Sequence, residues 1–456
     1  MPLQKNLLSL GILLSMAVAC TSPQRQAPTS VLITPEVSGD QGPTGWHEAR
    51  QTVADVAREA PNPDQFDSLL SSIGELSRSP LYKESRVELL IDGPATFREM
   101  FQAIEQAQHS IYLETYIFAD DEAGQQFAAR LMEKARQGID VRLIYDSIGS
   151  LSSGDGFFER MEEAGVKSIE YHAINPLDGG NPLDANTRDH RKILVVDDAV
   201  AFTGGINLSR TYSSGSSHSP SRASLDYGWR DTHIAIYGPA IDGFRQIFMQ
   251  QWHWQGGKPE NMPHVDVPIA RAGNDLVAVL QSEGGNDQES AIYRAYLDAM
   301  DIAVTNIWIT QAYFAPDDAF MTTLKAAAQR GVDVRIVVPG VSDSQLVLHA
   351  SRSRYGELLR AGVKIYENTS SVLHAKTAVI DGIWSTVGSS NLDYRSFIHN
   401  DEVNAVVLGT AFGRQMEAQF EQDIERGRPI KLEEWEQRSI TDRVREFFSW
   451  SVEYWL

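Results

Sequence analysis

Apolar residues recur along most of the chain at two spacings, which predict strands that alternate with helices. Short apolar runs of strand length fill residues 111–118, 141–145 and 167–171, whereas apolar residues at helical spacing fill 96–106 and 124–136. Strands and helices that alternate in this way are typical of an α/β protein, in which helices flank a mixed, mostly parallel β-sheet. We therefore expect an α/β fold.

The same order of elements occurs twice along the chain. Residues 111–146 resemble residues 307–340, and the second copy is three residues shorter within its helix. An Ala-Gly-Val turn and a strand follow in each copy, at 167–171 and 364–366. A helical solenoid would need a shorter period and more copies. Two related domains packed face to face are the simplest interpretation.

The termini differ from this duplicated region in composition. Residues after position 20 are rich in Pro, Ser, Gly and Gln and lack periodicity, which predicts a tether. The aromatic C-terminal tail predicts a helix that lies at a membrane interface or, as the sequence favours, docks on its own core. The expected segments are a signal peptide (1–19), a tether (20–45), an N-terminal helical segment (46–85), a first domain (86–262), a second domain (263–430) and a C-terminal amphipathic tail (431–456).

A histidine and a lysine stand two residues apart near the end of the second copy. His374, Lys376 and Asp381 have H-x-K-x4-D spacing, and Ser389 and Asn391 follow. Side chains two apart in a strand share a face, and the Asp-Gly pair after the strand predicts a hairpin. A histidine that titrates near neutral pH beside a fixed cation suits chemistry at a phosphate.

The first copy carries the same spacing at His190, Lys192 and Asp197, with Asn207 further along the chain. It has Gly205 where the second copy has Ser389. Asp197 and its counterpart Asp381 end their strands, so alternation points their side chains away from the His–Lys face. A structural role, in bonds to loop amides, is expected for both aspartates, although the motif that carries the chemistry includes them.

An acidic residue opens the strand that follows each motif. These residues are Asp231 in the first copy and Glu402 in the second. A nucleophilic imidazole needs one nitrogen free and the other held by an acceptor. Asp231 and Glu402 are expected to orient the histidines, one acid per half. The alternative is that both are solvated carboxylates at strand ends.

The composition excludes some classes of function and weakens others. Hydrophobic content of 42% and charged content of 22% are ordinary for a globular protein, but the net charge of −21 is strongly acidic. Nucleic-acid binding relies on Lys and Arg, so this charge counts against a nuclease without forbidding a local basic groove. The single cysteine, Cys20, allows no disulfide within the chain and no cysteine-based metal site. The lysine beside each histidine would compete with a metal ion, so neither a metal nor a cofactor is predicted.

Two motifs of the form H-x-K-x4-D-x6-G-[GS]-x-N are the signature of the phospholipase D superfamily. Longer stretches, from about Leu89 to the C-terminus, resemble bacterial cardiolipin synthases; they include LIDGPATF, YDSIGS, HRKILVVDDAVAFTGGINLS, WRDTHIAIYGPA, SRSRYGELLRAGVKIYE and LHAKTAVIDGIWSTVGSSNLD. The resemblance implies two tandem phospholipase D-like domains, packed pseudo-two-fold around one shared active site.

The resemblance also implies a reaction. His190 would attack phosphorus to give a phosphohistidine, and His374 would protonate the departing alcohol and later deprotonate the incoming one; the two roles could be swapped. Lys192 and Lys376 would hold the phosphoryl oxygens, helped by the substrate-binding group Asn207, Ser389 and Asn391. Two phosphatidylglycerols would give cardiolipin and glycerol. The alternatives are a hydrolytic phospholipase D, a secreted nuclease and a non-catalytic lipid-binding scaffold.

The N-terminus differs from that family, whose members often begin with transmembrane helices. Lys5, the apolar run at residues 7–18 and the small residues after it have the order of a secretory signal, too short to span a membrane. Ala17-Val18-Ala19-Cys20 resembles a bacterial lipobox, which implies lipid on Cys20 and a periplasm-facing lipoprotein, with the outer membrane favoured. The alternative is an ordinary cleaved signal.

Overall fold

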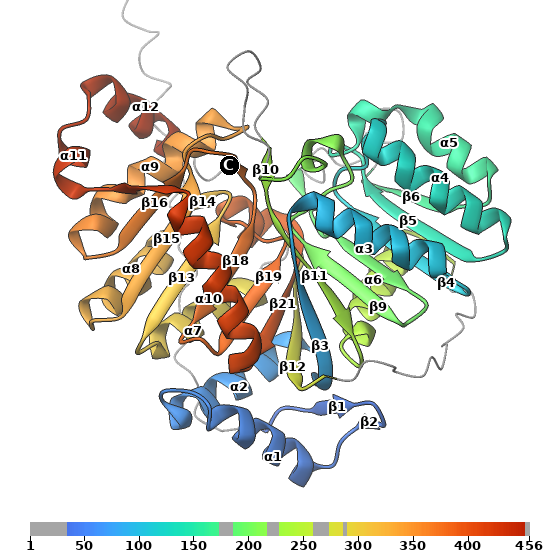
Figure 1. Ribbon diagram of the computed structural model, residues 1–456, viewed down its shortest axis with the longest axis horizontal. Coiled ribbons are helices and arrows are strands. Elements are labelled where there is room, and N and C mark those ends of the chain that lie inside the picture. The colour runs from blue at the N-terminus through green and yellow to red at the C-terminus, as the bar shows by residue number, and fades with distance from the viewer. Residues whose placement is uncertain (1–33, 173–185, 217–227, 259–272, 286–289, 452–456) are drawn as a thin grey trace, which may run out of the picture.

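The computed structural model of the protein describes residues 34–172, 186–216, 228–258, 273–285 and 290–451 (Figure 1). Two α/β halves stand side by side and share one continuous, strongly twisted sheet (Figure 1). The predicted signal peptide and Cys20 lie outside the described residues, as does most of the serine-rich insertion in the first half. No helix of the described part is both long and apolar enough to cross a bilayer.

The first half has a central sheet with helices on both faces. Its strands are β3 (Leu81–Ile91), β4 (Ser110–Thr115), β5 (Asp140–Asp146), β6 (Lys167–Tyr171), β8 (Ile193–Val196), β9 (Val200–Gly204) and β11 (Thr232–Tyr237), in the order β6-β5-β4-β8-β9-β11-β3. Helices α3 (Asp92–Gln106), α4 (Glu122–Arg136) and α5 (Asp155–Glu163) pack on one face, and α6 (Ile241–Trp254) packs on the other.

The second half repeats this topology. Its strands are β12 (Asp275–Ser282), β13 (Asn306–Gln311), β15 (Asp333–Pro339), β16 (Lys364–Asn368), β18 (Lys376–Ile380), β19 (Trp384–Gly388) and β21 (Asn400–Leu408), in the order β16-β15-β13-β18-β19-β21-β12. Its helices are α7 (Ala291–Ile302), α8 (Asp318–Gln329), α9 (Gln345–Arg360) and α10 (Thr410–Glu425). The identical strand order confirms the duplication that the sequence predicts.

Strand β3 joins the two halves. Tyr82 and Ser85, on either side of Glu84 with its φ of 60°, pair with β12, and residues 86–91 pair with β11. One buried apolar cluster also draws on both halves, since it contains Phe248 of α6 and Phe412 of α10. The halves therefore form one folded body.

The sheets are mixed, as predicted for this α/β fold, and the helices flank them. Within the two seven-strand orders given above, parallel pairing is confined to β4, β5 and β6 and to the matching strands β13, β15 and β16. The other neighbours in each order are antiparallel, because the hairpin that carries each His–Lys motif and the strands after it reverse direction at every turn. Within each seven-strand order, antiparallel pairs therefore outnumber parallel pairs.

The N-terminal residues that the structure describes belong to the fold. β1 (Val37–Gly39) pairs with the start of β3 and with β2 (Gly42–Pro43), and Val37 is buried. This corrects the predicted tether at 20–45, because residues 37–43 form strands despite their loop-like composition. Likewise β3 begins at Leu81, five residues before the predicted domain boundary.

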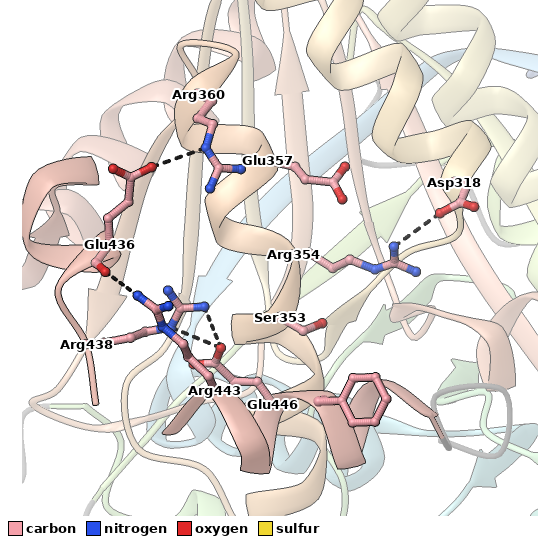
Figure 2. Close-up of a pocket in the computed structure, with 10 residues that line it drawn as sticks. Asp318, Ser353, Arg354, Glu357, Arg360, Glu436, Arg438, Arg443 and Glu446 are labelled. Carbon is pink, nitrogen blue, oxygen red and sulfur yellow. Dashed lines mark hydrogen bonds and ion pairs between the residues drawn. The ribbon is translucent and has the colours of Figure 1, made fainter. Parts of the chain in front are cut away.

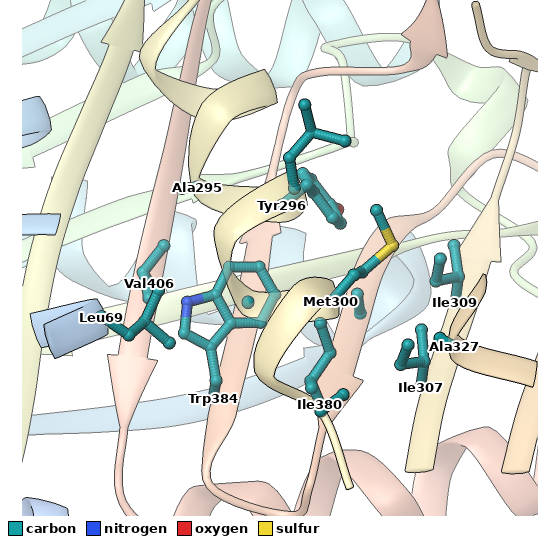
Figure 3. Packing of buried hydrophobic residues seen from close by; sticks show 14 of the residues in the cluster. Leu69, Ala295, Tyr296, Met300, Ile307, Ile309, Ala327, Ile380, Trp384 and Val406 are labelled. Carbon is teal, nitrogen blue, oxygen red and sulfur yellow. The ribbon is translucent and has the colours of Figure 1, made fainter. Parts of the chain in front are cut away.

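Two N-terminal helices cover the second half. α1 (Trp46–Ala57) and α2 (Pro63–Ser77) lie below the sheet in Figure 1. Leu69 of α2 shares a cluster with Tyr296 of α7 and with the buried Trp384 of β19 (Figure 3). Close packing of these apolar side chains holds the N-terminal helices against the second half.

The C-terminal segment folds back on its own core, as the sequence favoured. After α10, strand β22 (Gly427–Ile430) pairs with β16, and α11 (Leu432–Glu436) and α12 (Ile440–Ser451) follow. The side chains of α12 and α11 line a cavity together with those of α9.

Candidate active site

The His–Lys motifs lead into the two predicted hairpins. β18 pairs with β19, and Asp381 and Gly382 at the turn have φ of 53° and 64°, the left-handed conformation that an Asp-Gly turn adopts. The strand begins at Lys376, so His374 stands two residues before it. The reason lies in the other half, which binds the residues before each histidine.

Each half lends a short strand to the other. β7 (Arg188–Asp189) runs parallel to the start of β21, and β10 (Trp229–Arg230) runs parallel to β17 (Val372–Leu373). The amide of His190 donates to the Asp401 carbonyl at 2.9 Å, and the amide of His374 donates to the Arg230 carbonyl at 2.8 Å. The opposite half therefore fixes the main chain of each histidine.

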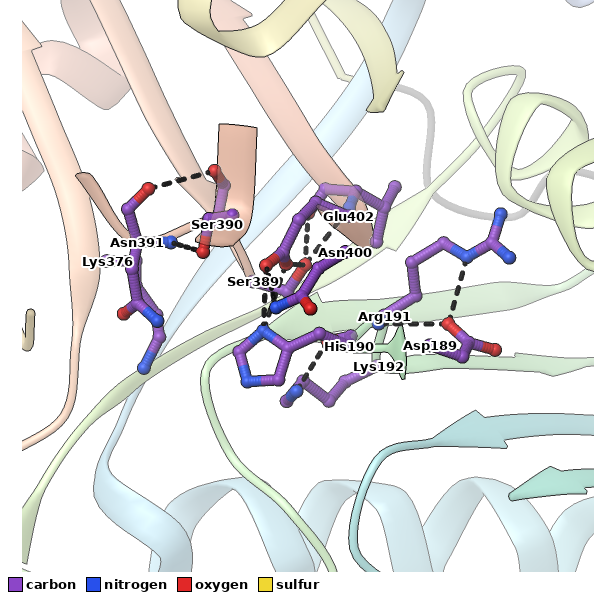
Figure 4. Close-up of polar contacts among 12 residues, drawn as sticks. Asp189, His190, Arg191, Lys192, Lys376, Ser389, Ser390, Asn391, Asn400 and Glu402 are labelled. Atoms are coloured by element: carbon purple, nitrogen blue, oxygen red, sulfur yellow. Dashed lines mark hydrogen bonds and ion pairs between the residues drawn. The ribbon is translucent and has the colours of Figure 1, made fainter. Parts of the chain in front are cut away.

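The acids that follow the motifs bind the histidines in a crossed pattern. Nδ1 of His190 lies 3.0 Å from both carboxylate oxygens of Glu402 (Figure 4). Nδ1 of His374 lies 2.7 Å from Oδ2 of Asp231. Each acid thus contacts the histidine of the other half. This geometry leaves Nε2 as the nitrogen of each ring that could face a substrate.

Burial controls the charge of the first pair. Burial lowers the pKa of His190 to about 4, although Glu402 acts in the opposite direction. Burial opposes ionisation of Glu402, but His190, Lys192 and the Ser389 hydroxyl together lower the pKa of Glu402 to about 2. Near neutral pH the pair is therefore a neutral imidazole that donates from Nδ1 to a carboxylate.

The second histidine has more cationic surroundings. Burial and Lys376 lower the pKa of His374, while Asp231 raises it. Nζ of Lys376 lies 3.0 Å from Nδ1 and 3.1 Å from Nε2 of this ring. The hydroxyl of Tyr212 lies 3.5 Å from the same Nδ1. His374 is therefore the more crowded of the two imidazoles.

Both lysines are buried and fold back on the histidine beside them. Nζ of Lys192 donates to the His190 carbonyl, and Nζ of Lys376 donates to the His374 carbonyl, each at 2.5 Å. Burial lowers the pKa of Lys192 to about 7 and that of Lys376 to about 8. An anion bound between the two ammonium groups would stabilise their charged forms, so the site suits a phosphate.

The two asparagines have different partners. Oδ1 of Asn207 accepts from the Ile117 amide at 3.2 Å, and its Nδ2 donates to the Tyr212 hydroxyl at 3.0 Å. Oδ1 of Asn391 is buried with no hydrogen-bond partner among the described residues. Both ends of the Asn207 amide are therefore engaged within the protein, whereas Oδ1 of Asn391 is not; only the NH2 group of Asn391 can donate to a phosphoryl oxygen, because Oδ1 is an acceptor.

Ser389 contacts an acid and not the space between the lysines. Its hydroxyl donates to Oε2 of Glu402 at 2.5 Å and accepts from the Val403 amide at 3.0 Å. We therefore revise the substrate-binding role predicted for Ser389 to one of positioning Glu402. In the first half, a Cβ at Gly205 would lie 2.2 Å from Oδ1 of Asp231, so the residue there must be glycine.

The aspartates of the motifs lie at the opposite ends of their strands from the histidines. The Asp197 carboxylate accepts three main-chain amides, from Gln108, His109 and Ser110, at 2.6–2.8 Å. The Asp381 carboxylate accepts the amides of residues 304–306 at 2.7–3.3 Å. These contacts fit the expected structural role, and they remove both aspartates from the group that we assign to the chemistry.

Sequence reasoning did not single out the aromatic residues around the histidines. The rings of Tyr212, Trp229 and Tyr313 lie 5.7, 5.2 and 6.4 Å from the ring of His374, and Tyr116 lies 5.1 Å from His190. Tyr116 and Tyr313 stand just after the repeated strands β4 and β13. A tyrosine repeated at this place in both copies could have indicated a position near the active site. Trp229 stands two residues before Asp231, where strand periodicity also places it near the site.

Comparison with known proteins places this geometry in a family. The family model described as "Cardiolipin synthase, PLD-like domain" matches residues 100–217 and 296–424. A cardiolipin synthase of Geobacillus sp. (strain WCH70) is 36% identical over 84% of this chain and 74% of its own length. A cardiolipin synthase of Halalkalibacterium halodurans is 35% identical over 81% and 72%. The chain belongs to the cardiolipin synthase family of phospholipase D-like proteins.

Members of this family are phosphatidyltransferases, and each of the two matched segments falls within one of the halves described above. A probable cardiolipin synthase of Bacillus subtilis is 33% identical over 80% of the chain and 71% of its own length. Among solved structures, a phosphatidylserine synthase of Haemophilus influenzae superposes with a TM-score of 0.61 at 14% identity, over 85% of this chain and all of that one. That likeness supports the fold alone.

Proposed function

We propose that the protein is a phosphatidyltransferase that converts two phosphatidylglycerols into cardiolipin and glycerol through a phosphohistidine. The observation that carries the proposal is the crossed pairing of two buried His–carboxylate pairs between two buried lysines, in a chain of the cardiolipin synthase family. Together these groups supply a nucleophile, a proton donor and fixed positive charge, as exchange at a phosphodiester requires.

In the first step, Nε2 of His190 attacks phosphorus, and the P–O bond to glycerol breaks. The anionic phosphodiester, once bound beside the ring, offsets the lowering effect of burial and Lys376 and favours protonated His374, which gives its proton to the departing glycerol oxygen. Lys192 and Lys376 hold the phosphoryl oxygens as their charge increases, with help from the side-chain amide of Asn391. The products of this step are glycerol and a phosphatidyl group on His190.

In the second step, neutral His374 takes a proton from the headgroup hydroxyl of another phosphatidylglycerol. The resulting oxygen attacks phosphorus, the P–N bond to His190 breaks and cardiolipin is released. Both imidazoles regain their starting protonation states, so no nucleotide or other co-reactant is consumed. An exchange of one phosphodiester for another suits an enzyme outside the cytoplasm.

Three observations support His190 as the nucleophile. Both oxygens of Glu402 hold its Nδ1, and Ser389 fixes Glu402 in turn. No hydrogen bond to its Nε2 is recorded among the described residues, whereas Lys376 lies beside Nε2 of His374. A neutral imidazole with its outer nitrogen free is the form that can attack phosphorus.

The test is to incubate purified protein with phosphatidylglycerol that carries a labelled glycerol headgroup and to separate the products. Formation of cardiolipin with release of one labelled glycerol for each cardiolipin supports the proposal. Phosphatidic acid as the only lipid product would replace it with hydrolysis, because water can release the same intermediate. A plasmid-degradation assay tests the nuclease alternative, which the net charge of −21 opposes.

We also propose that Cys20 carries lipid and holds the protein on the periplasmic side of the envelope, with the outer membrane favoured. The support is the order of Lys5, the apolar run and Ala17-Val18-Ala19-Cys20. Cys20→Ser should abolish metabolic labelling of the protein with palmitate. Unchanged labelling of that variant would disprove the anchor without affecting the proposed chemistry.

A further inference from the structure

The C-terminal helix α12 docks on the protein through its polar side. Glu446 and Ser449, three residues apart on one face, are only 4% and 3% exposed. The Glu446 carboxylate binds Arg438 at 2.7–3.0 Å. Glu446 and Arg438 line a cavity of about 750 Å³ together with Ser353 and Arg354 of α9. Figure 2 shows these four residues around it.

The opposite side of α12 is apolar and exposed. Ile440, Val444, Phe447 and Phe448 are 80%, 49%, 61% and 67% exposed. Their spacing of four, seven and eight residues from Ile440 places all four on one stripe of the helix. A helix on a water-soluble protein normally buries such a stripe and exposes its polar face. α12 does the reverse.

We propose that this stripe lies in the interfacial layer of a phospholipid bilayer and holds the active site against it. The inference rests on the proposed function, since the substrate of that reaction is a bilayer lipid. Paired aromatic rings beside arginines are the composition of helices that lie in the plane of a membrane interface. Arg443 and Arg445 flank the stripe and are exposed. From Arg438 to Ser451 the chain has three arginines and two acids, whereas the whole protein is strongly acidic.

The helix that carries the stripe is connected to the active site through α9 and the loop before it. α12 lies along α9, and the loop before α9 contains Asp343, whose carboxylate accepts from the Tyr313 hydroxyl at 2.9 Å. The ring of Tyr313 faces His374. Leu346 in the first turn of α9, three residues after Asp343, is also apolar and 44% exposed.

The first half carries exposed apolar groups at the matching place. Ile148 and Leu151 follow β5, which corresponds to β15 before α9, and Leu151 is 72% exposed. Asp146 at the end of β5 accepts from the Asp189 amide, next to His190. Exposed apolar side chains thus follow the two equivalent strands, β5 and β15, one in each half.

A second copy of the chain is the alternative occupant of the stripe. Four side chains, two of them Phe with about 150–250 Å² each when fully buried, fall short of the about 800 Å² per partner that stable complexes bury. A bilayer has no such minimum, because insertion adds to other anchors, including the proposed lipid on Cys20.

A fluorescent label on the stripe distinguishes a bilayer from a second copy of the chain as its occupant. An environment-sensitive fluorophore on Val444→Cys, in the full-length Cys20→Ser protein, should shift to shorter wavelength when vesicles of phosphatidylglycerol and phosphatidylethanolamine are added. The matched control is a label on Trp254→Cys, an exposed position at the end of α6, which should not shift. If the protein floats with the vesicles while the Val444 label does not shift, the proposal is wrong. A shift that depends on protein concentration without lipid would replace it with self-association.

Activity gives a second, independent measurement. Phe447→Asp with Phe448→Asp should lower turnover of phosphatidylglycerol in vesicles by about tenfold or more, while a short-chain, monomeric phosphatidylglycerol should be used at the parent rate. An equal loss on both substrates would overturn the proposal in favour of a structural role. If the parent makes no cardiolipin, the proposed function fails, but the fluorophore experiment still decides the membrane contact.

Discussion

The two halves share one topology, yet they differ most in what lies behind the histidines. Behind His190 is a buried ionic cluster in which Arg191 binds Glu114 at 2.9 Å, Asp189 at 3.1 Å and Asp401 at 3.2 Å. Behind His374 the apolar side chains of Val337, Leu373, Ala375 and Phe420 pack together, beside one buried ion pair between Arg230 and Asp423 at 2.8 Å. Similar main-chain positions for the two histidines are thus reached with different packing, an ionic cluster in one half and a mainly apolar group in the other. Backbone placement comes from the crossed strand pairs, and the packing behind them was free to change.

The acids show the same contrast at shorter range. Glu402 has the longer side chain and is steadied by the Ser389 hydroxyl, whereas Asp231 is shorter and needs the empty space at Gly205. Each acid reaches its histidine at 2.7–3.0 Å. The two His–carboxylate distances are similar, but the residues that support the two acids cannot replace each other. This difference is a basis for assigning different roles to His190 and His374.

Removal of either histidine tests that division of roles and should have the largest effect. His190→Ala and His374→Ala should each lower cardiolipin synthesis by about a thousandfold or more. A substrate with a nitrophenol leaving group needs no proton donor, so His374→Ala should accumulate phosphatidyl on His190, measurable by mass spectrometry of the intact protein. Accumulation in His190→Ala, with none in His374→Ala, would reverse the assignment.

Exchanging the residues that support the two acids, Gly205 and Ser389, should reduce activity and stability by unequal amounts. Gly205→Ser puts a side chain where Asp231 stands, so His374 should lose its partner and activity should fall by about 10–100-fold, with a lower melting temperature. Ser389→Gly removes one hydrogen bond to Glu402 and should cost less. Thermal unfolding and kcat measured together would show this; equal effects of the two changes would contradict the contrast.

The ionic cluster should make the first half sensitive to loss of a single charge. Arg191→Ala leaves Glu114, Asp189 and Asp401 buried without their shared cation, which should reduce the free energy of unfolding by about 3–5 kcal/mol. Ala375→Ser, at the corresponding position of the second half, is the matched control and should cost less. Urea unfolding measures both. Similar losses would show that the cluster does not depend on Arg191.

The lysines should give the smallest effect, visible as a pH dependence. Because their pKa values are lowered to about 7 for Lys192 and about 8 for Lys376, the free enzyme should lose positive charge as the pH rises through this range. kcat/KM should therefore decline above about pH 7–8 and not near the ordinary lysine value of about 10.4. Lys192→Arg, whose cation does not titrate, should move this decline upward more than Lys376→Arg. A decline that stays in place in both variants would assign it to another group.

The sequence predicted the parts of the site that repeat and missed those that do not. His190, Lys192, His374 and Lys376 were found because their spacing recurs. Asp231 and Glu402 were found because each is an acid near the start of the strand after its motif, one residue before β11 and the third residue of β21. The crossing of the acids follows from β7–β21 and β10–β17, pairs of two residues that no periodicity signals. The buried strand β1 was missed because Val37 stands alone among polar and turn-forming residues, so only its contact with β3 defines it.

The exchange of short strands has a consequence for how the two halves can change. In an assembly of two identical chains, a substitution would appear on both sides of the symmetry axis and would have to suit both histidines. Here the two sides are encoded by separate stretches of one chain, and their one-to-one ratio is fixed by covalent connection. A glycine beside one acid and a serine beside the other can therefore coexist, and each side can become specialised without copying the change to its partner.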